Sequence, residues 1–250
     1  MNHTLRWPMR RLIALFAACL LLANGGARAV TQDEVTAGAA RLYRGRIAEL
    51  TQAGMLDRDA AFLARVDRIA RRLGQQARLD QPGAPAWAWE IHTSSDADDN
   101  ASCMAGGKIL ISQPYVEQLA LTDAELAMVL SHEMQHAILQ HNLKEYDEAV
   151  RLDPGWLGQP FSALEHAVDH DGRLMGRLAA LNKEQEIEAD QAGLAMAWRA
   201  GWAAKDLAGF FRKLERASNA GNLGSASHQA PLQRWRAARS QAALLDSGAR

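Results

Sequence analysis

The sequence is poor in cysteine, has no extended run of one charge and has no long hydrophobic segment. Its two cysteines are Cys19, inside an N-terminal apolar run, and Cys103. If that run is removed on export, no intrachain disulfide is available, so the hydrophobic core must hold the fold. A lone thiol such as Cys103 is tolerated in an exported protein when it is buried. With 48% hydrophobic and 23% charged residues, the composition is globular and excludes disordered, fibrous and repeat classes.

The N-terminus has the pattern of a secretory signal peptide. Arg6, Arg10 and Arg11 form a basic region before an apolar run at residues 12–23, which is too short to span a bilayer comfortably. Ala27-Arg28-Ala29 then supplies an A-x-A cleavage signal. We predict cleavage after Ala29, with an uncleaved membrane anchor as the alternative.

Cleavage there would leave one domain, residues 30–250, with room for a single sizeable core. That domain would carry 24 basic and 29 acidic residues. A negative balance gives no electrostatic reason to expect nucleic acid or anionic lipid as a partner. We expect a periplasmic or secreted protein with no mature transmembrane segment, and we keep peripheral membrane association as an alternative.

Apolar periodicity predicts a mostly helical domain with a small amount of sheet. Helices are expected at residues 31–55, 58–77, 161–181, 184–200 and 205–217, and strands at 87–92 and 108–111. Thr122-Asp123-Ala124-Glu125 has the pattern of a capping box, which predicts a further helix running to about His141.

That capped helix contains His132-Glu133-Met134-Gln135-His136, the H-E-x-x-H pattern. Two histidines four residues apart project from one face of a helix, so both imidazoles can reach one cation. Glu133 stands where a general base could deprotonate an attacking water. The uncharged residues around the motif are typical of a helix packed in a core, which favours a metal site over a merely structural helix.

A zinc hydrolase needs a third protein ligand, and the acidic segment at residues 184–190 offers several. Glu186 and Asp190 are four apart and share a helix face, so one could bind metal while the other supports a ligating imidazole. By spacing alone, Glu184 and Glu188 are rivals to Glu186. The alternative interpretation is a solvated acidic helix face.

These two segments together resemble the gluzincin metallopeptidases of the HtpX and CAAX prenyl protease type. That family has a second motif, E-x-x-A-D, matched here by Glu186-Ile187-Glu188-Ala189-Asp190. The resemblance implies Glu186 as the third zinc ligand and Asp190 as its supporting partner. It covers about residues 60–239 and is similar to the exported bacterial branch that contains the periplasmic proteases BepA and LoiP.

Two further segments carry the resemblance, with departures. Residues 100–109 resemble the family's strand beside the substrate cleft, which implies that Asn100, Gly106 and Gly107 border the substrate. Ser102, Cys103 and Ala105 stand where that strand usually has Phe, Ala and Pro, and Gln229 stands where the family has Pro after its His. Ser227-His228 and Arg234 resemble the S-H-P-x-x-x-x-R segment. The resemblance implies that His228 or Arg234 stabilises the oxyanion, or that His228 blocks the zinc at rest.

The remaining histidines have simpler interpretations. His141, without the spacing of a metzincin ligand, is expected to be a helix-terminal cation or a solvent-facing residue. His166 and His170 are four apart but lack a neighbouring catalytic Glu, so we keep a second metal site there only as an alternative. His92 is expected to be a strand residue.

We therefore expect an α+β, mostly helical, zincin-like metalloprotease domain with a small β-sheet or hairpin beside the H-E-x-x-H helix. It would bind one Zn²⁺ and hydrolyse misfolded or unassembled envelope polypeptides. The alternative is a zinc-containing envelope chaperone or assembly factor, working with the envelope assembly machinery. The pattern leaves open the physiological substrate, cleavage preference, oligomeric state and the role of residues 142–181.

Overall fold

A computed structural model describes residues 29–82, 88–219 and 230–248 of the chain. The predicted signal peptide up to residue 28 and His228 lie outside these residues. None of the described helices combines the length and the apolar character needed to cross a membrane. The fold is mostly helical with one small sheet, as the sequence predicts.

The sheet has three strands in the order β1-β3-β2. β1 (Glu90–Ser94) is parallel to β3 (Lys108–Ser112), and β2 (Ala101–Met104) is antiparallel to β3. Ile109 and Ile111 of β3 are fully buried, as expected for a central strand. β1, at residues 90–94, lies later in the chain than the strand predicted at residues 87–92.

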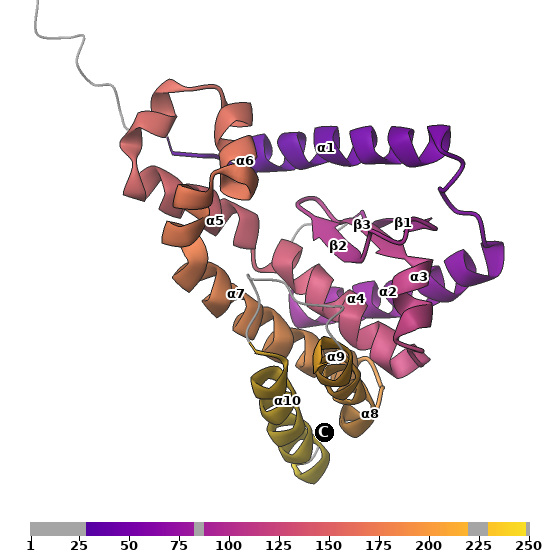
Figure 1. Cartoon of the computed structure of the whole chain (residues 1–250). Coiled ribbons are helices and arrows are strands. Elements are labelled where there is room, and N and C mark those ends of the chain that lie inside the picture. Colours follow the sequence, from indigo (N-terminus) through magenta and orange to yellow (C-terminus); the bar gives the residue numbers. More distant parts are fainter. Residues whose placement is uncertain (1–28, 83–87, 220–229, 249–250) are drawn as a thin grey trace, which may run out of the picture.

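Two helices enclose this sheet (Figure 1). α1 (Gln32–Gln52) lies along one side, while α2 (Ala60–Asp80) packs on the other, together with the motif helix. The apolar face of α2 is buried, and Asp59 caps its N-terminus by accepting from two backbone N–H groups. A short helix, α3 (Gln113–Gln118), follows β3.

The motif helix is α4 (Asp123–Ile138), and its predicted capping box is confirmed. The backbone N–H of Glu125 donates to Thr122 Oγ1 over 3.3 Å, and the backbone N–H of Thr122 donates to the Glu125 carboxylate over 2.8 Å. α4 packs along α7 (Gly172–Arg199), the longest described helix. At Gly193 of α7, an added Cβ would lie 2.9 Å from the His132 backbone nitrogen, so a glycine is needed for this close approach.

Several helix boundaries differ from the prediction. α4 stops at Ile138, because Gln140 adopts a left-handed conformation with φ of 56°, and α5 (His141–Leu152) begins at once. The predicted helix pair at 161–181 and 184–200 is instead α6 (Phe161–His170) and the continuous α7, divided at Asp171. Asp171 caps α7 by accepting from two backbone N–H groups, which explains the early division.

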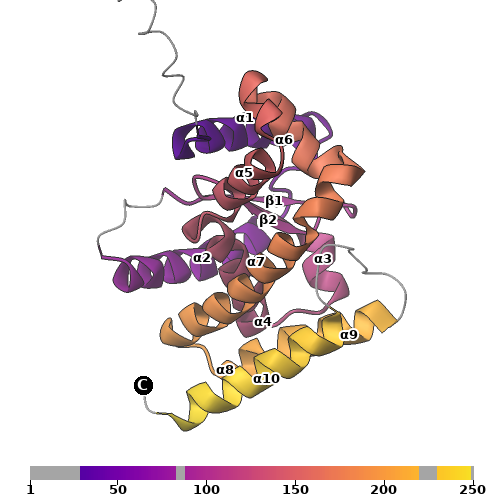
Figure 2. The same ribbon diagram turned by 90° about the vertical axis from the view of Figure 1, so that its left-hand side faces the viewer.

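The other described elements complete the two ends of the molecule. They are the 3₁₀ helix η1 (Pro154–Gly158), α8 (Ala204–Leu207), α9 (Gly209–Asn219) and α10 (Pro231–Ser247). α5 and α10 were missed by the sequence prediction. α10 lies against α7, α8 and α9 (Figure 2). This packing brings Arg234 of α10 to Asp190, in the second half of α7.

Buried apolar side chains form two main clusters. The central core lies between α2, the sheet, α4 and the second half of α7, and includes Val66, Ile109, Leu130 and Leu194. The wall core lies between α1, α5, α6 and the first half of α7, and includes Val35, Tyr146, Leu164 and Leu178. The helices of the wall core stand at the α1 end of the molecule (Figure 1).

Candidate metal centre

His132 and His136 project from the same face of α4, one turn apart. Their Nε2 atoms are 3.2 Å apart and their ring centroids 4.9 Å apart. His132 is buried, and His136 is partly exposed at the edge of a cleft. The predicted i, i+4 arrangement therefore brings two nitrogen ligands to one point.

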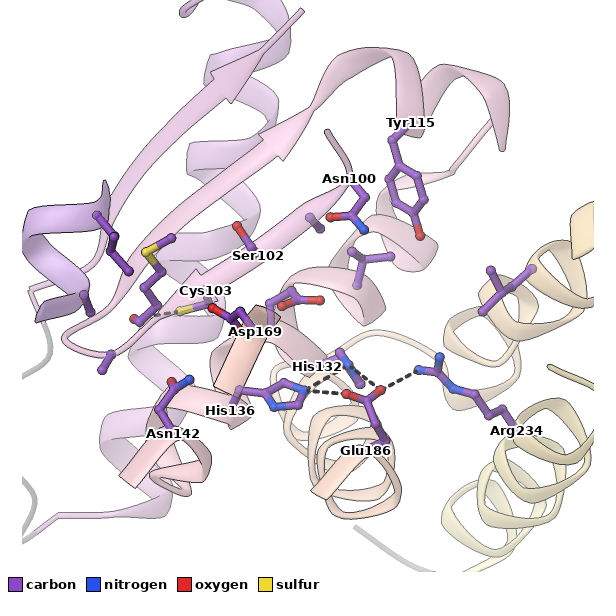
Figure 3. A pocket seen from close by; sticks show the side chains of 18 of the residues that line it. Asn100, Ser102, Cys103, Tyr115, His132, His136, Asn142, Asp169, Glu186 and Arg234 are labelled. Carbon is purple, nitrogen blue, oxygen red and sulfur yellow. Dashed lines mark hydrogen bonds and ion pairs between the residues drawn. The ribbon is translucent and has the colours of Figure 1, made fainter. Parts of the chain in front are cut away.

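Glu186 of α7 reaches the same point from the facing helix (Figure 3). Its carboxylate oxygens lie 3.6 Å from His132 Nε2 and 3.4 Å from His136 Nε2. Ligand atoms about 2.0–2.2 Å from a tetrahedral zinc ion are roughly 3.3–3.6 Å from one another, so these separations fit zinc. Among the residues that the structure describes, these three are the group that satisfies the spacing of a metal site.

The two rival carboxylates lie elsewhere. Glu184 is exposed on α7, two residues before Glu186 and therefore on the side of the helix turned away from the histidines. The carboxylate of Glu188 contacts His141 and Lys144 instead of the ligand group. Geometry thus selects Glu186, the residue that the family resemblance implies.

Asp190 supports His132 from behind. Its Oδ1 lies 2.9 Å from Nδ1 of His132, which leaves Nε2 directed toward His136 and Glu186. Burial raises the pKa of the Asp190 carboxyl, but His132 and Arg234 outweigh burial and lower it overall, so Asp190 is an anion. Burial lowers the pKa of His132, but Asp190, together with Glu133 and Glu186, outweighs burial and raises it overall.

Arg234 of α10 is held by the same carboxylate. Its Nε and Nη2 donate to the two oxygens of Asp190 over 2.8 and 2.7 Å, and Nη2 lies 4.0 Å from Glu186. The guanidinium is buried and stands over the ring of Phe211. Arg234 is therefore at the site, where its contacts position Asp190; its predicted action on an oxyanion remains a prediction, as does that of His228, which lies outside the described residues.

Glu133 and the ligand group open into a cleft of about 780 Å³. β2 forms one side of the cleft, which residues 100–105 line without a break. Figure 3 shows Asn100, Ser102 and Cys103 along this strand, opposite His136 and Glu186. Burial, reinforced by the nearby charge of Glu133, raises the pKa of the Cys103 thiol, so the sulfur is a neutral lining atom.

The predicted substrate strand needs correction at its second half. Gly106 and Gly107 lie in the turn between β2 and β3 with φ of 83° and 78°, and they do not line the cleft. An added Cβ would meet Thr36 at the first and Trp89 at the second. Lys108 and Ile109 belong to β3, whose two edges are already paired with β1 and β2. Of residues 100–109, only those of β2 therefore lie in an edge strand, and this strand lines the cleft.

Comparison with known sequences agrees with this site. The sequence profile described as Peptidase family M48 matches residues 62–243. The chain belongs to this family. The M48 match includes the ligand group, Glu133, Asp190 and Arg234, and it begins after α1.

One curated relative of the M48 domain is the mitochondrial metalloendopeptidase OMA1 of Schizosaccharomyces pombe. The two are 27% identical over 131 residues, or 52% of this chain. The aligned part is 37% of the relative's length, so the chain matches little more than a third of that protein.

His141 does not face solvent, which corrects one expectation from the sequence of the M48 domain. It is buried, with 2% of its surface exposed. Its Nδ1 lies 3.0 Å from Nδ1 of His136, and its Nε2 lies 3.1 Å from Glu188. On a continuous helix a residue five positions on would point elsewhere, but the left-handed Gln140 brings His141 back toward His136. No periodicity in the sequence signals this turn.

Tyr115 of α3 is a second cleft residue that the sequence did not suggest (Figure 3). Burial, and then the charge of Glu133, raise the pKa of its phenol, so the hydroxyl keeps its proton. The sequence carries little indication of this role, because Tyr115 lies in a short polar helix outside both motifs.

The other histidines that the structure describes lie away from the ligand group. His92 is in β1, as predicted, with its Nδ1 2.6 Å from Asp57. The rings of His166 and His170 stack on the surface of α6, and they belong to no three-ligand group among the described residues. The second-metal hypothesis for this pair therefore has no third ligand to support it.

Proposed function

We propose that this chain is a zinc-dependent metalloendopeptidase. The observation that carries the proposal is the set of three ligand atoms with tetrahedral spacing at the base of a cleft, beside Glu133 and along the free edge of β2. Family membership and the metalloendopeptidase named among its relatives support the same conclusion.

His132, His136 and Glu186 would hold the zinc ion. When bound, zinc supplies a Lewis acid for a peptide carbonyl and lowers the pKa of water. Glu133 takes the proton of the attacking water and then delivers it to the leaving amine. Asp190, fixed by Arg234, keeps the His132 ring in the orientation that directs Nε2 to the metal.

The substrate we propose is an extended polypeptide that adds to the edge of β2. Main-chain pairing with an edge strand accepts many sequences, since the hydrogen bonds come from backbone groups. An unfolded segment can adopt this conformation at lower cost than a segment of a native domain. We therefore propose misfolded or unassembled envelope proteins as substrates, and the periplasm or exterior as the place of action. The chaperone or assembly-factor alternative predicts zinc binding with little turnover.

The test is the change Glu133→Gln, with Glu184→Gln as the matched control. Both remove one carboxylate, but Glu184 is exposed on α7 and away from the cleft. We expect Glu133→Gln to retain one equivalent of zinc and to lose about 10²- to 10⁴-fold in casein cleavage, because the neutral amide cannot accept the proton of the attacking water. The control should cleave like the wild type. Undiminished cleavage by Glu133→Gln would show that another mechanism operates.

Export is tested separately. The full chain is expressed in a bacterium, and the periplasmic fraction is analysed by N-terminal sequencing. We expect a mature N-terminus at Val30. An intact N-terminus in the membrane fraction would instead support the uncleaved anchor.

A further inference from the structure

The two histidines of the ligand group are supported in different ways. His132 contacts a buried carboxylate directly, through Asp190. His136 has the buried ring of His141 at its Nδ1, and Glu188 lies on the far side of that ring. The proposed roles of Glu133, Asp190 and the zinc ligands involve neither His141 nor Glu188.

The contacts of each ring nitrogen indicate which nitrogen carries the proton. Nε2 of His136 faces Nε2 of His132 and the Glu186 carboxylate, which makes it the atom that would bind metal. A neutral imidazole whose Nε2 binds a metal carries its proton on Nδ1. At 3.0 Å, Nδ1 of His141 must then accept that proton's hydrogen bond, and so His141 carries its own proton on Nε2.

The contacts of His141 Nε2 fit this assignment. Nε2 of His141 lies 3.1 Å from Oε2 of Glu188, and the same oxygen accepts from Lys144 Nζ over 3.4 Å. A carboxylate acceptor at this position favours the Nε2–H form of His141 over the form that would oppose two N–H groups to each other. The series of hydrogen bonds therefore runs from Glu188 through His141 to His136 and ends at the metal position.

The backbone fixes His141 where this order requires it. Gln140 in its left-handed conformation ends the α4 periodicity, and the side-chain amide of Gln185 donates to the His141 carbonyl over 3.1 Å. The ring has 2% exposure, whereas the Glu188 side chain is 49% exposed. A neutral ring thus links His136 to an anion that water still solvates, beside a site that already holds Glu133, Glu186 and Asp190.

We propose that His141 and Glu188 are positioning residues that hold His136 in its metal-binding tautomer and orientation. The proposal rests on the proposed zinc site, but it concerns zinc affinity and does not require that the chain cleave peptides. Carboxylate-linked support of a ligating histidine is typically worth about 10- to 100-fold in metal affinity.

The experiment measures the zinc dissociation constant by chelator competition and the absorption spectrum of the Co²⁺-substituted protein. His141→Leu removes the acceptor and should weaken zinc binding by about 10- to 100-fold and alter the Co²⁺ spectrum. His141→Asn places an amide oxygen near the position of Nδ1 and should recover most of the affinity. Glu188→Gln keeps a hydrogen-bond acceptor without the charge and should weaken binding by a few-fold, whereas Glu184→Gln on the same helix should match the wild type.

Stability of the metal-free variants is measured beside affinity by circular dichroism. If His141→Leu does not fold, His141→Asn and Glu188→Gln decide the matter. A purely structural His141 would lower the melting temperature of the metal-free protein and leave zinc affinity and the Co²⁺ spectrum unchanged, which would overturn the proposal. A wild-type protein that binds zinc but cleaves nothing would overturn the proposed function and leave the affinity series interpretable.

Discussion

The central core and the wall core meet at the cleft, yet they are built differently. The central core buries a large continuous set of apolar residues, while the wall core buries fewer and includes α1, which precedes the M48 match. The helices of the wall core also carry buried or partly buried acidic residues, Glu145 on α5 and Glu165 on α6. The motif helix α4, with His132, Glu133 and His136, belongs to the half with the larger core.

This difference suggests an uneven distribution of stability. Regions with fewer buried apolar contacts open at lower free energy than the global unfolding of the domain. α7 belongs to both halves, so matched substitutions along this helix compare them within one element. We expect the wall to loosen first, while α4 and the second half of α7 keep the ligand group assembled.

The largest effect is expected from truncating a core leucine in each half. Leu130→Ala in α4 and Leu178→Ala in α7 both remove a side chain with no exposed surface. Leu130→Ala should lower the free energy of unfolding by about 4 kcal/mol and Leu178→Ala by about 2–3 kcal/mol, because the smaller wall core can collapse around the cavity. Urea denaturation gives both values.

Hydrogen exchange then shows which helices lose stability in each variant. Leu178→Ala should increase exchange in α5 and α6 and leave α4 protected, whereas Leu130→Ala should affect all elements. Equal, global changes for both variants would mean that the two cores unfold as one unit, and the comparison would fail.

A second comparison uses the same substitution at two glycines of α7. In Gly193→Ala the new Cβ would meet backbone atoms of Ser131 and His132 at 2.9–3.1 Å, so α4 must shift. We expect a loss of about 2–3 kcal/mol and reduced zinc affinity. Gly176 is exposed with nothing within 4 Å of a new Cβ, so Gly176→Ala should stabilise the helix by up to about 1 kcal/mol. Thermal denaturation and chelator competition measure both.

The sequence predicted the half that holds the site better than the other half. The capping box at Thr122 and the apolar face of α2 are local patterns, and both appear as expected. His132, His136 and Glu186 could be assigned because i, i+4 spacing and a second motif encode their geometry. The same periodicity failed where one residue changes the backbone direction, as Gln140 does.

Tertiary pairing explains the other failures. Residues 100–109 read as one strand, but the turn at Gly106 and Gly107 folds them into a hairpin whose second strand is central in the sheet. The arrangement of α1 against α5 and α6 depends on contacts between segments more than one hundred residues apart, such as Arg41 with Glu165. Local patterns carry no information about such contacts.

The pH dependence of stability tests the wall directly. Burial raises the pKa of Glu145 to about 7, although Asn182 donates to its carboxylate. The unfolded chain ionises this group near its ordinary value of 4.5, so the folded state binds the extra proton and loses stability as pH rises from about 4.5 to 7. Glu145→Gln should match the wild type at pH 4.5 and exceed it by about 1–2 kcal/mol at pH 8, a value reduced because the side chain is only partly buried.

Urea denaturation at both pH values measures this difference. Glu184→Gln, in an exposed position, serves as the control and should show no such dependence. A constant difference between Glu145→Gln and the wild type at all pH values would mean that Glu145 does not titrate in the wall.

The smallest effect is expected at the contact that ties α1 to the rest of the wall. Arg41 pairs with the buried Glu165, but the arginine side chain is 52% exposed, so water can replace much of the interaction. Arg41→Met should cost only about 1 kcal/mol overall, and the loss should appear as faster hydrogen exchange in α1, with α2 and α4 unchanged. Adding Glu165→Gln removes the anion left without its partner and should recover part of that protection. If α4 exchanges faster as well, α1 supports the central core through the sheet, and the two halves are less independent than their packing indicates.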